Sequence, residues 1–192
     1  MKNTGKIAAI LSNSIFRLNE NELEILTEMM QEKVVKKGEF LLKEGAIAKD
    51  IYWVSSGMLR QFYYKDGRDI TEHFACEGQG ALCITSLFNQ VGSKLIVEAL
   101  ENSTVFLMPY DKLIYLSEQH KGIAGLLRKL LEGSLIMSQE KADSWRFETV
   151  RERYERFLRE YPDAAKRASV NHIASYLLMT PESLSRVRAG LL

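Results

Sequence analysis

The strongest constraint on the fold lies between Val34 and Met108, where short runs rich in Val, Ile, Phe and Tyr alternate with glycine-containing turns. The segment LRQFYYKDGRDITEHF, residues 59–74, places two such runs around Lys-Asp-Gly, which predicts a β-hairpin. Strands at this regular spacing, without helices between them, predict an antiparallel barrel or sandwich. A polar stretch at about 80–94 interrupts the pattern, and residues 95–109 contribute two further strands.

Helices are predicted on both sides of this region. Residues 19–32 favour a short amphipathic helix, and residues 121–146, which lack proline, favour one long helix. The long helix has two apolar stripes, so both must be buried. One face can lie on the barrel, and the simplest partner for the other is a second copy of the helix, although the C-terminal helices are an alternative. We predict a homodimer helix that contains Ile123, Leu127, Leu130 and Met137; the second stripe is Leu131, Leu135, Ala142 and Trp145.

The last 45 residues predict a small helical unit. Thr149 and Glu152 have the spacing of a capping box, and the helix that follows runs to Pro162. Ser169 can cap the next helix, and Thr180 followed by proline predicts the start of the last one. In that last helix we expect one face to pack inward through Leu184, Val187 and Leu191.

Composition restricts the class of protein. Among 192 residues, 46% are hydrophobic and 27% charged, as in ordinary globular proteins, and no apolar run is long enough to span a membrane. No signal peptide is indicated, so we expect a cytoplasmic protein without membrane contact. Cys76 and Cys83 are too few for a disulfide framework and fit no common zinc spacing. We therefore expect no metal and no other cofactor.

Charge is distributed unevenly along the chain. The net charge is +1, but residues 141–192 hold ten of the 26 Lys/Arg residues and seven of the 25 Asp/Glu residues, a local excess of +3. This modest basic end is compatible with an anionic partner. In the last helix, Arg186 can form a bidentate pair with guanine and Glu182 can accept from cytosine. The predicted double-stranded DNA contacts are Thr180, Glu182, Ser183, Ser185, Arg186 and Arg188. Alternatively, Glu182 and Arg186 simply pair with each other at i, i+4.

Three stretches resemble the Crp/Fnr superfamily of bacterial transcription regulators: DIYWVSSGMLRQFY, RERYERFLREYP and IASYLLMTPESLSRVR. The last is similar to the version found in Bacteroidetes-type members. The resemblance implies an α+β fold with an N-terminal cyclic-nucleotide-binding-like β-roll, a double-stranded β-helix as in cupins. The expected domains are the roll at 1–110, a helical hinge and dimerisation helix at 111–146, and a helix-turn-helix domain at 147–192. Glu182 and Arg186 match the family's base-reading residues.

The sequence departs from the family in three places. Only AGLL follows Arg188, so the β-hairpin wing of many members is not expected. Leu178 stands where the turn between the two helices usually has glycine, so either the turn geometry differs or a positive φ at Leu178 strains the unit by about 1–2 kcal/mol. The cassette that binds cyclic AMP is degraded: Ala81 lies near the expected Glu, and Ser93-Lys94 replace Arg-Ser. The effector pocket inferred from this alignment contains Gly80, Ala81, Leu82, Ser93 and Lys94.

The leading hypothesis is a homodimeric, non-enzymatic DNA-binding regulator whose roll senses an unidentified small effector, not cyclic AMP, or none. Cys76 and Cys83 lie inside the roll, which excludes the iron–sulfur sensor of the oxygen-sensing branch. A metal-dependent barrel enzyme needs several converging ligands, and the barrel segment has a single histidine, His73. A third possibility is a ligand-binding roll whose terminal helices contact protein.

Overall fold

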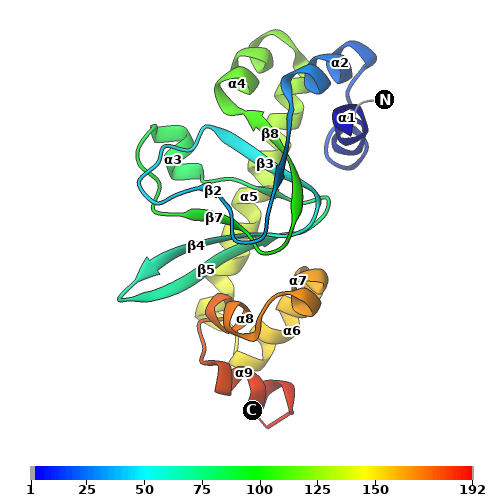
Figure 1. Ribbon diagram of the computed structural model, residues 1–192. Coiled ribbons are helices and arrows are strands. Elements are labelled where there is room, and N and C mark those ends of the chain that lie inside the picture. The colour runs from blue at the N-terminus through cyan, green and yellow to red at the C-terminus, as the bar shows by residue number, and fades with distance from the viewer. Residues whose placement is uncertain (1–2, 192) are drawn as a thin grey trace.

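The computed structural model describes residues 3–191 and has three tiers along its length (Figure 1). Two helices at the N-terminus, α1 (Asn3–Ser14) and α2 (Glu20–Met29), lie at one end, and the C-terminal helices lie at the other. The capping box of Asn19 and Glu22 starts α2. The first helix is not among the sequence predictions: it buries Ile7, Ala8 and Leu11 against the rest of the core.

The middle tier is a roll of two four-stranded antiparallel sheets. In one sheet the order is β1 (Gln31–Val35), β8 (Ser103–Pro109), β3 (Asp50–Ser56) and β6 (Gly80–Ala81). In the other, the order is β2 (Phe40–Leu42), β7 (Ile96–Ala99), β4 (Leu59–Lys65) and β5 (Arg68–Ala75). The prediction of an antiparallel β-domain is confirmed. Its interruption at about 80–94 contains the short helix α3 (Ile84–Asn89).

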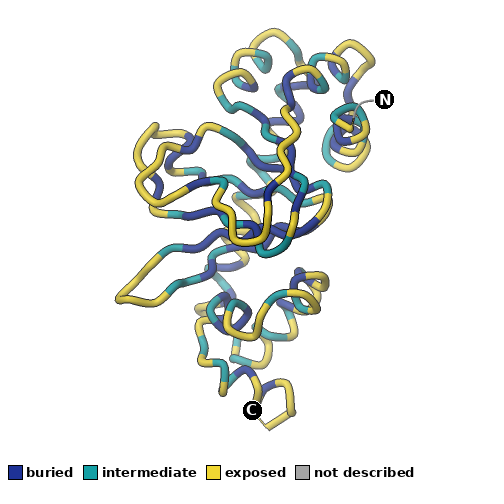
Figure 2. The backbone as a smooth tube through the Cα atoms, in the orientation of Figure 1, coloured by how far each residue is buried: buried dark blue, intermediate teal, exposed yellow. Residues whose placement is uncertain are grey.

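The hairpin predicted at residues 59–74 is present as β4 and β5, which pair from Lys65–Arg68 to Leu59–Ala75. Asp66 and Gly67 form its two-residue turn with φ of 51° and 74°. Positive φ at both positions matches the right-handed twist of the strands, which is why Asp-Gly is favoured there. The hairpin tip projects as an exposed loop, whereas its base is buried (Figure 2).

The helix α4 (Tyr110–Gln119) lies at the same end of the roll as α2 and leads into the long helix α5 (Lys121–Phe147), which runs behind the roll (Figure 1). The absence of proline predicted this long helix. The assignment of its stripes requires correction. Ile123 and Leu127 are buried in the core of their own chain, so they face the roll and are not available to a second copy. Leu130 packs on the same core, and only Met137 of that stripe is exposed.

Four helices complete the chain: α6 (Val150–Glu160), α7 (Pro162–Arg167), α8 (Val170–Tyr176) and α9 (Pro181–Arg188). The caps predicted at Thr149, Ser169 and Thr180 all form. Leu184 and Val187 are buried as expected, but Leu191 is exposed because α9 ends before it. No strand follows α9 within the described residues.

The C-terminal helices share a hydrophobic cluster with the roll. Phe74 of β5 is fully buried among the rings of Phe157, Tyr161 and Tyr176, with centroid separations of 5.8–6.1 Å. Met58 and Cys76 of the roll join the same cluster. The terminal helices therefore dock on β5 through apolar packing and do not hang free at the end of α5.

Candidate nucleic-acid interface and ligand cavity

The start of α9 is fixed by local chemistry. The Thr180 side chain accepts from the backbone N–H of Ser183 at 3.1 Å, and Pro181 occupies the first helical position, where no N–H is required. Leu184 and Val187 anchor the opposite face of the helix. These constraints fix which side of α9 faces solvent.

That solvent face carries most of the predicted DNA contacts. Glu182, Ser185 and Arg186 are exposed, and Ser183 is half-buried. Glu182 and Arg186 form no ion pair with each other in the described residues, so both are open to a partner. Backbone N–H groups at the start of α9 and the Thr180 hydroxyl lower the pKa of Glu182. Arg188 differs: its guanidinium carbon lies 5.8 Å from the centre of the Tyr154 ring in α6.

The turn that orients α9 contains the strain expected from the sequence. Leu178 has a φ of 53°, and its side chain is about half exposed. The backbone N–H of Met179 bonds back to Ala174 at 3.0 Å, which closes the turn around this conformation. Of the two alternatives that the sequence left open, a different turn geometry or a positive φ at Leu178, the structure has the second.

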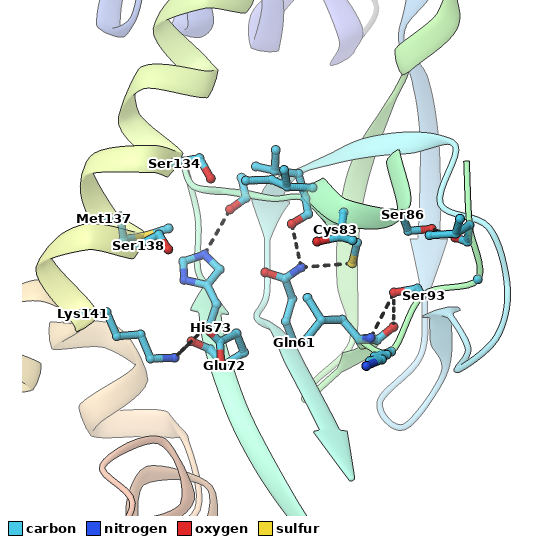
Figure 3. A pocket seen from close by; sticks show the side chains of 18 of the residues that line it. Gln61, Glu72, His73, Cys83, Ser86, Ser93, Ser134, Met137, Ser138 and Lys141 are labelled. Carbon is cyan, nitrogen blue, oxygen red and sulfur yellow. Dashed lines mark hydrogen bonds and ion pairs between the residues drawn. The ribbon is translucent and has the colours of Figure 1, made fainter. Parts of the chain in front are cut away.

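A cavity of about 600 Å³ lies between the roll and α5 (Figure 3). Four of the five residues inferred for the effector pocket line it: Gly80, Leu82, Ser93 and Lys94. Ala81 does not, because it is fully buried and pairs with Tyr52 across β3 and β6. Lys94 is exposed, and Ser93 uses its hydroxyl to bond the backbone of Leu95.

The inner wall of the cavity is made by residues that sequence reasoning did not assign to it. Gln61 of β4 donates from Nε2 to the carbonyl of Leu82 at 3.1 Å and to the Cys83 sulfur at 3.3 Å. Ser134 and Ser138 of α5 face it from the other side (Figure 3). These residues come from segments more than 70 positions apart, so no local motif could have indicated them.

His73 forms the boundary between the cavity and the terminal helices. Its Nδ1 lies 2.9 Å from the Tyr161 hydroxyl, and its Nε2 lies 3.2 Å from the carbonyl of Gly80. A carbonyl only accepts, so Nε2 carries the proton and Tyr161 donates to Nδ1. Complete burial lowers the pKa of His73 to about 4, which keeps the ring neutral.

Lys141 of α5 closes the same end of the cavity. Its Nζ lies 3.1 Å from Oε1 of Glu72 and also donates to the Glu72 carbonyl. It lies 4.8 Å from the ring centres of both Trp145 and Tyr176. Burial lowers the pKa of Lys141, and Glu72 opposes that effect. The pair ties the roll, the long helix and α8 together.

Two further contacts hold the terminal helices on the roll. Ser175 of α8 donates to the carbonyl of Asp69 and accepts from the backbone N–H of Thr71, both at 2.8 Å. Arg167 of α7 pairs with Glu77 and Glu101 at 2.6 Å each. Movement of the terminal helices therefore requires the roll to give up specific polar partners, in β5 and in the turns that contain Glu77 and Glu101.

A metal centre is not indicated in the part of the chain that the structure describes. No three His, Cys, Asp or Glu side chains between residues 3 and 191 converge as a ligand set. The cysteines at 76 and 83 are both buried and unpaired. Among the described helices, none has the length and apolar character needed to cross a bilayer.

Comparison with known proteins agrees with this architecture. Residues 32–120 match the family model of the cyclic nucleotide-binding domain. The fumarate and nitrate reduction regulatory protein of Yersinia pestis is 27% identical over 187 residues, which cover 90% of this chain and 73% of the relative. The protein of the same name from Escherichia coli is 27% identical over 190 residues, with the same coverage.

Solved structures share the fold at low sequence identity. FixK2 from Bradyrhizobium japonicum superposes with a TM-score of 0.72 at 23% identity, covering 84% of each chain. The c-di-GMP responsive global regulator CLP from Xanthomonas campestris has a TM-score of 0.70 at 17% identity, covering 90% of this chain and 91% of its own. Both likenesses concern the fold alone.

Proposed function

We propose that this chain is a transcription regulator of the Crp/Fnr type and reads a specific double-stranded DNA sequence as a homodimer through α9. The observation that carries the proposal is the face of α9: Glu182, Ser185 and Arg186 are exposed together and unpaired with one another, on a helix whose opposite face is buried. A short helix of this kind suits the major groove, where Arg recognises guanine and Glu accepts from cytosine.

Phosphate contacts would surround this reading face. Thr180 and Ser183 lie at the N-terminal end of α9, where hydroxyls and backbone N–H groups favour anionic oxygens. Arg188 is drawn toward Tyr154, so we assign it to the phosphate backbone and not to a base edge. With few phosphate contacts per subunit, binding should depend on dimerisation and weaken steeply with salt.

The dimer face is assigned to the second stripe of α5. Leu131, Leu135, Ala142 and Trp145 share one side of the helix; Leu131 also packs on the core of its own chain, so the face is centred on Leu135, Ala142 and Trp145. Leu135 is 69% exposed in the single chain, which leaves it available to a second copy. Two α9 helices related by a two-fold axis would enter successive major grooves, about 34–36 Å apart.

The cavity is proposed as the effector site because some residues of its wall also hold the terminal helices, and with them α9, on the roll. Tyr161 and Lys141 line the cavity, and both also contact the cluster that seats α8 on β5. A bound molecule would change the balance between docked and released terminal helices. The division into domains at 1–110, 111–146 and 147–192, the likeness to Bacteroidetes-type members and the cytoplasmic location stay predictions.

The test is fluorescence anisotropy with a randomised duplex pool in a salt series. We compare the wild type, Arg186→Ala and a control, Arg17→Ala, which removes the same charge at an exposed site near the opposite end of the molecule. We expect selective binding that falls with salt, and selectivity lost only in Arg186→Ala, at a cost of about 1–3 kcal/mol. Equal behaviour of the two variants would refute base reading by α9. The alternative, that the terminal helices bind a protein partner, would then be favoured.

A further inference from the structure

The cavity presents one buried hydrogen-bond acceptor without a partner. Gln61 is 4% exposed, and its Nε2 is committed to the Leu82 carbonyl and the Cys83 sulfur. A carbonyl cannot donate, so the amide cannot be flipped and Oε1 must lie on the other side. Oε1 makes no hydrogen bond within residues 3–191, and it is not among the unpartnered atoms that are fully buried, so a ligand can reach it. Figure 3 shows it on the side that faces His73 and α5.

The charges around the cavity balance locally. Lys141 is paired with Glu72, with Nζ 3.1 Å from Oε1, so its charge is already compensated. His73 is neutral because burial lowers its pKa, and its two nitrogens already have Gly80 and Tyr161 as partners. The remaining cation is Lys94, which is exposed at the edge. A phosphate or carboxylate inside would lose its hydration without a buried cation or a guanidinium fork to replace it.

The rest of the lining is mixed. Apolar groups come from five residues that surround the cavity: Leu82, Ile84, Val91, Leu95 and Met137. The hydroxyls of Ser134 and Ser138 also line it and make no hydrogen bond elsewhere in the described chain. Such a site, apolar with a few directed polar groups, is typical of small-molecule pockets, and a volume of about 600 Å³ lies within their usual range.

We propose that this cavity takes an uncharged, partly apolar small molecule that donates an N–H or O–H to Oε1 of Gln61, opposite the Ser134 and Ser138 hydroxyls. The inference rests on the proposed function, since it specifies the chemical class of the effector. Gln61 is then the residue that determines specificity, because a ligand without a donor leaves a buried acceptor unpaired.

The experiment uses three probes that differ at one group, benzamide, N,N-dimethylbenzamide and benzoate, together with cyclic AMP. Saturation-transfer NMR on the full chain measures the affinity of each. We expect benzamide to bind roughly tenfold more tightly than its dimethyl analogue, as one lost hydrogen bond of about 1.4 kcal/mol implies. The two charged probes should be weaker than benzamide. This comparison is made on the wild type and needs no variant.

Two variants locate the site. Gln61→Met keeps side-chain length without an acceptor and should remove the preference for benzamide, whereas Lys94→Ala at the rim should leave it unchanged. If Gln61→Met does not fold, Ser134→Ala takes its place, with a smaller expected loss. Equal binding of the two amides, tighter binding of benzoate or cyclic AMP that is lost in Lys94→Ala, or no saturation of any probe would each overturn the proposal. DNA binding is measured separately by anisotropy, so failure there does not alter this result.

Discussion

The imidazole of His73 in β5 and the phenol of Tyr161 at the end of α6 are joined by a hydrogen bond of 2.9 Å between Nδ1 and Oη. The two residues are 88 positions apart, and both are buried where the roll meets the terminal helices. Tyr161 donates and His73 accepts while the ring is neutral, and protonation of Nδ1 would reverse donor and acceptor. The cost of charging the ring comes from its burial, which lowers the pKa of His73.

The burial of His73 predicts a dependence of stability on pH. The pKa of His73 is lowered to about 4 by burial, while the unfolded chain has the ordinary value near 6.5. Between these values the unfolded state binds a proton that the folded state excludes. Stability from this residue is therefore full above pH 6.5 and falls as the pH drops toward 4, by about 3 kcal/mol in total.

The pH effect of His73 can be measured by urea unfolding at a series of pH values. His73→Gln should lose less stability than the wild type between pH 6.5 and 4, because it has no group to titrate there. His120→Gln is the control, since that imidazole is only half-buried and precedes α5 without a side-chain capping hydrogen bond. Parallel curves for wild type and His73→Gln would show that His73 does not titrate in this window.

A second prediction concerns Ser175, which bonds both Asp69 and Thr71 of β5. Ser175→Ala leaves the Thr71 N–H and the Asp69 carbonyl without their partner and should cost about 1–3 kcal/mol of docking. Amide hydrogen exchange at Thr71 should accelerate in the variant. Ser185→Ala, on the exposed face of α9, should leave exchange at Thr71 as it is in the wild type.

Leu178 offers a stabilising substitution. A φ of 53° destabilises a residue that has a Cβ by about 1–2 kcal/mol. Glycine removes this strain, but it also raises the conformational entropy of the unfolded chain, so only part of the strain energy is gained as stability. Leu178→Gly should raise the free energy of unfolding by roughly 0.5–1 kcal/mol. Leu178→Ala keeps the strain, so thermal melts of the two variants side by side distinguish backbone conformation from loss of the leucine side chain.

In the turn between β3 and β4, substitution of Gly57 by alanine should strongly lower the stability of the fold. Its φ is +93°, and an added Cβ would lie 2.7 Å from the Cα of Ser103, a backbone atom that cannot turn aside. Gly57→Ala should destabilise the fold by about 3 kcal/mol, from backbone strain and overpacking together. Gly38 has a similar φ of +83° with open space around it, so Gly38→Ala should cost about 1 kcal/mol. Similar losses for the two variants in denaturant unfolding would contradict the contact with Ser103.

The assignment of the dimer face gives a matched pair on α5. Leu135 is 69% exposed on the apolar stripe, and the adjacent Ile136 is 56% exposed on another side of the helix. Leu135→Glu should shift the protein toward monomer in light scattering coupled to gel filtration, because it places two like charges opposite each other across the two-fold axis. Ile136→Glu should remain dimeric. A monomeric wild type at micromolar concentration would refute the dimer itself.

Local features of the fold followed from the sequence because short-range chemistry decides them. The Lys-Asp-Gly hairpin, the capping box at Thr149, the start of α9 at Thr180 and the positive φ of Leu178 each depend on a few neighbouring residues. The alternation of glycine turns and β-branched runs also indicated an antiparallel barrel or sandwich, and the roll itself followed from the family resemblance. Helix α1 was not predicted, because its apolar pattern is weak. It is stabilised by tertiary packing, which buries Ile7 and Leu11 in the core.

Only the tertiary structure decided which residues meet. Periodicity showed that α5 has two apolar faces, but not that Ile123 and Leu127 belong to the roll and Leu135 to solvent. The cavity joins Gln61, Ser134, Lys141 and Tyr161 from distant segments, and no spacing rule relates them. The physical reason is that the sequence sets each element's faces locally, whereas the partner of each face depends on how all the elements share one core.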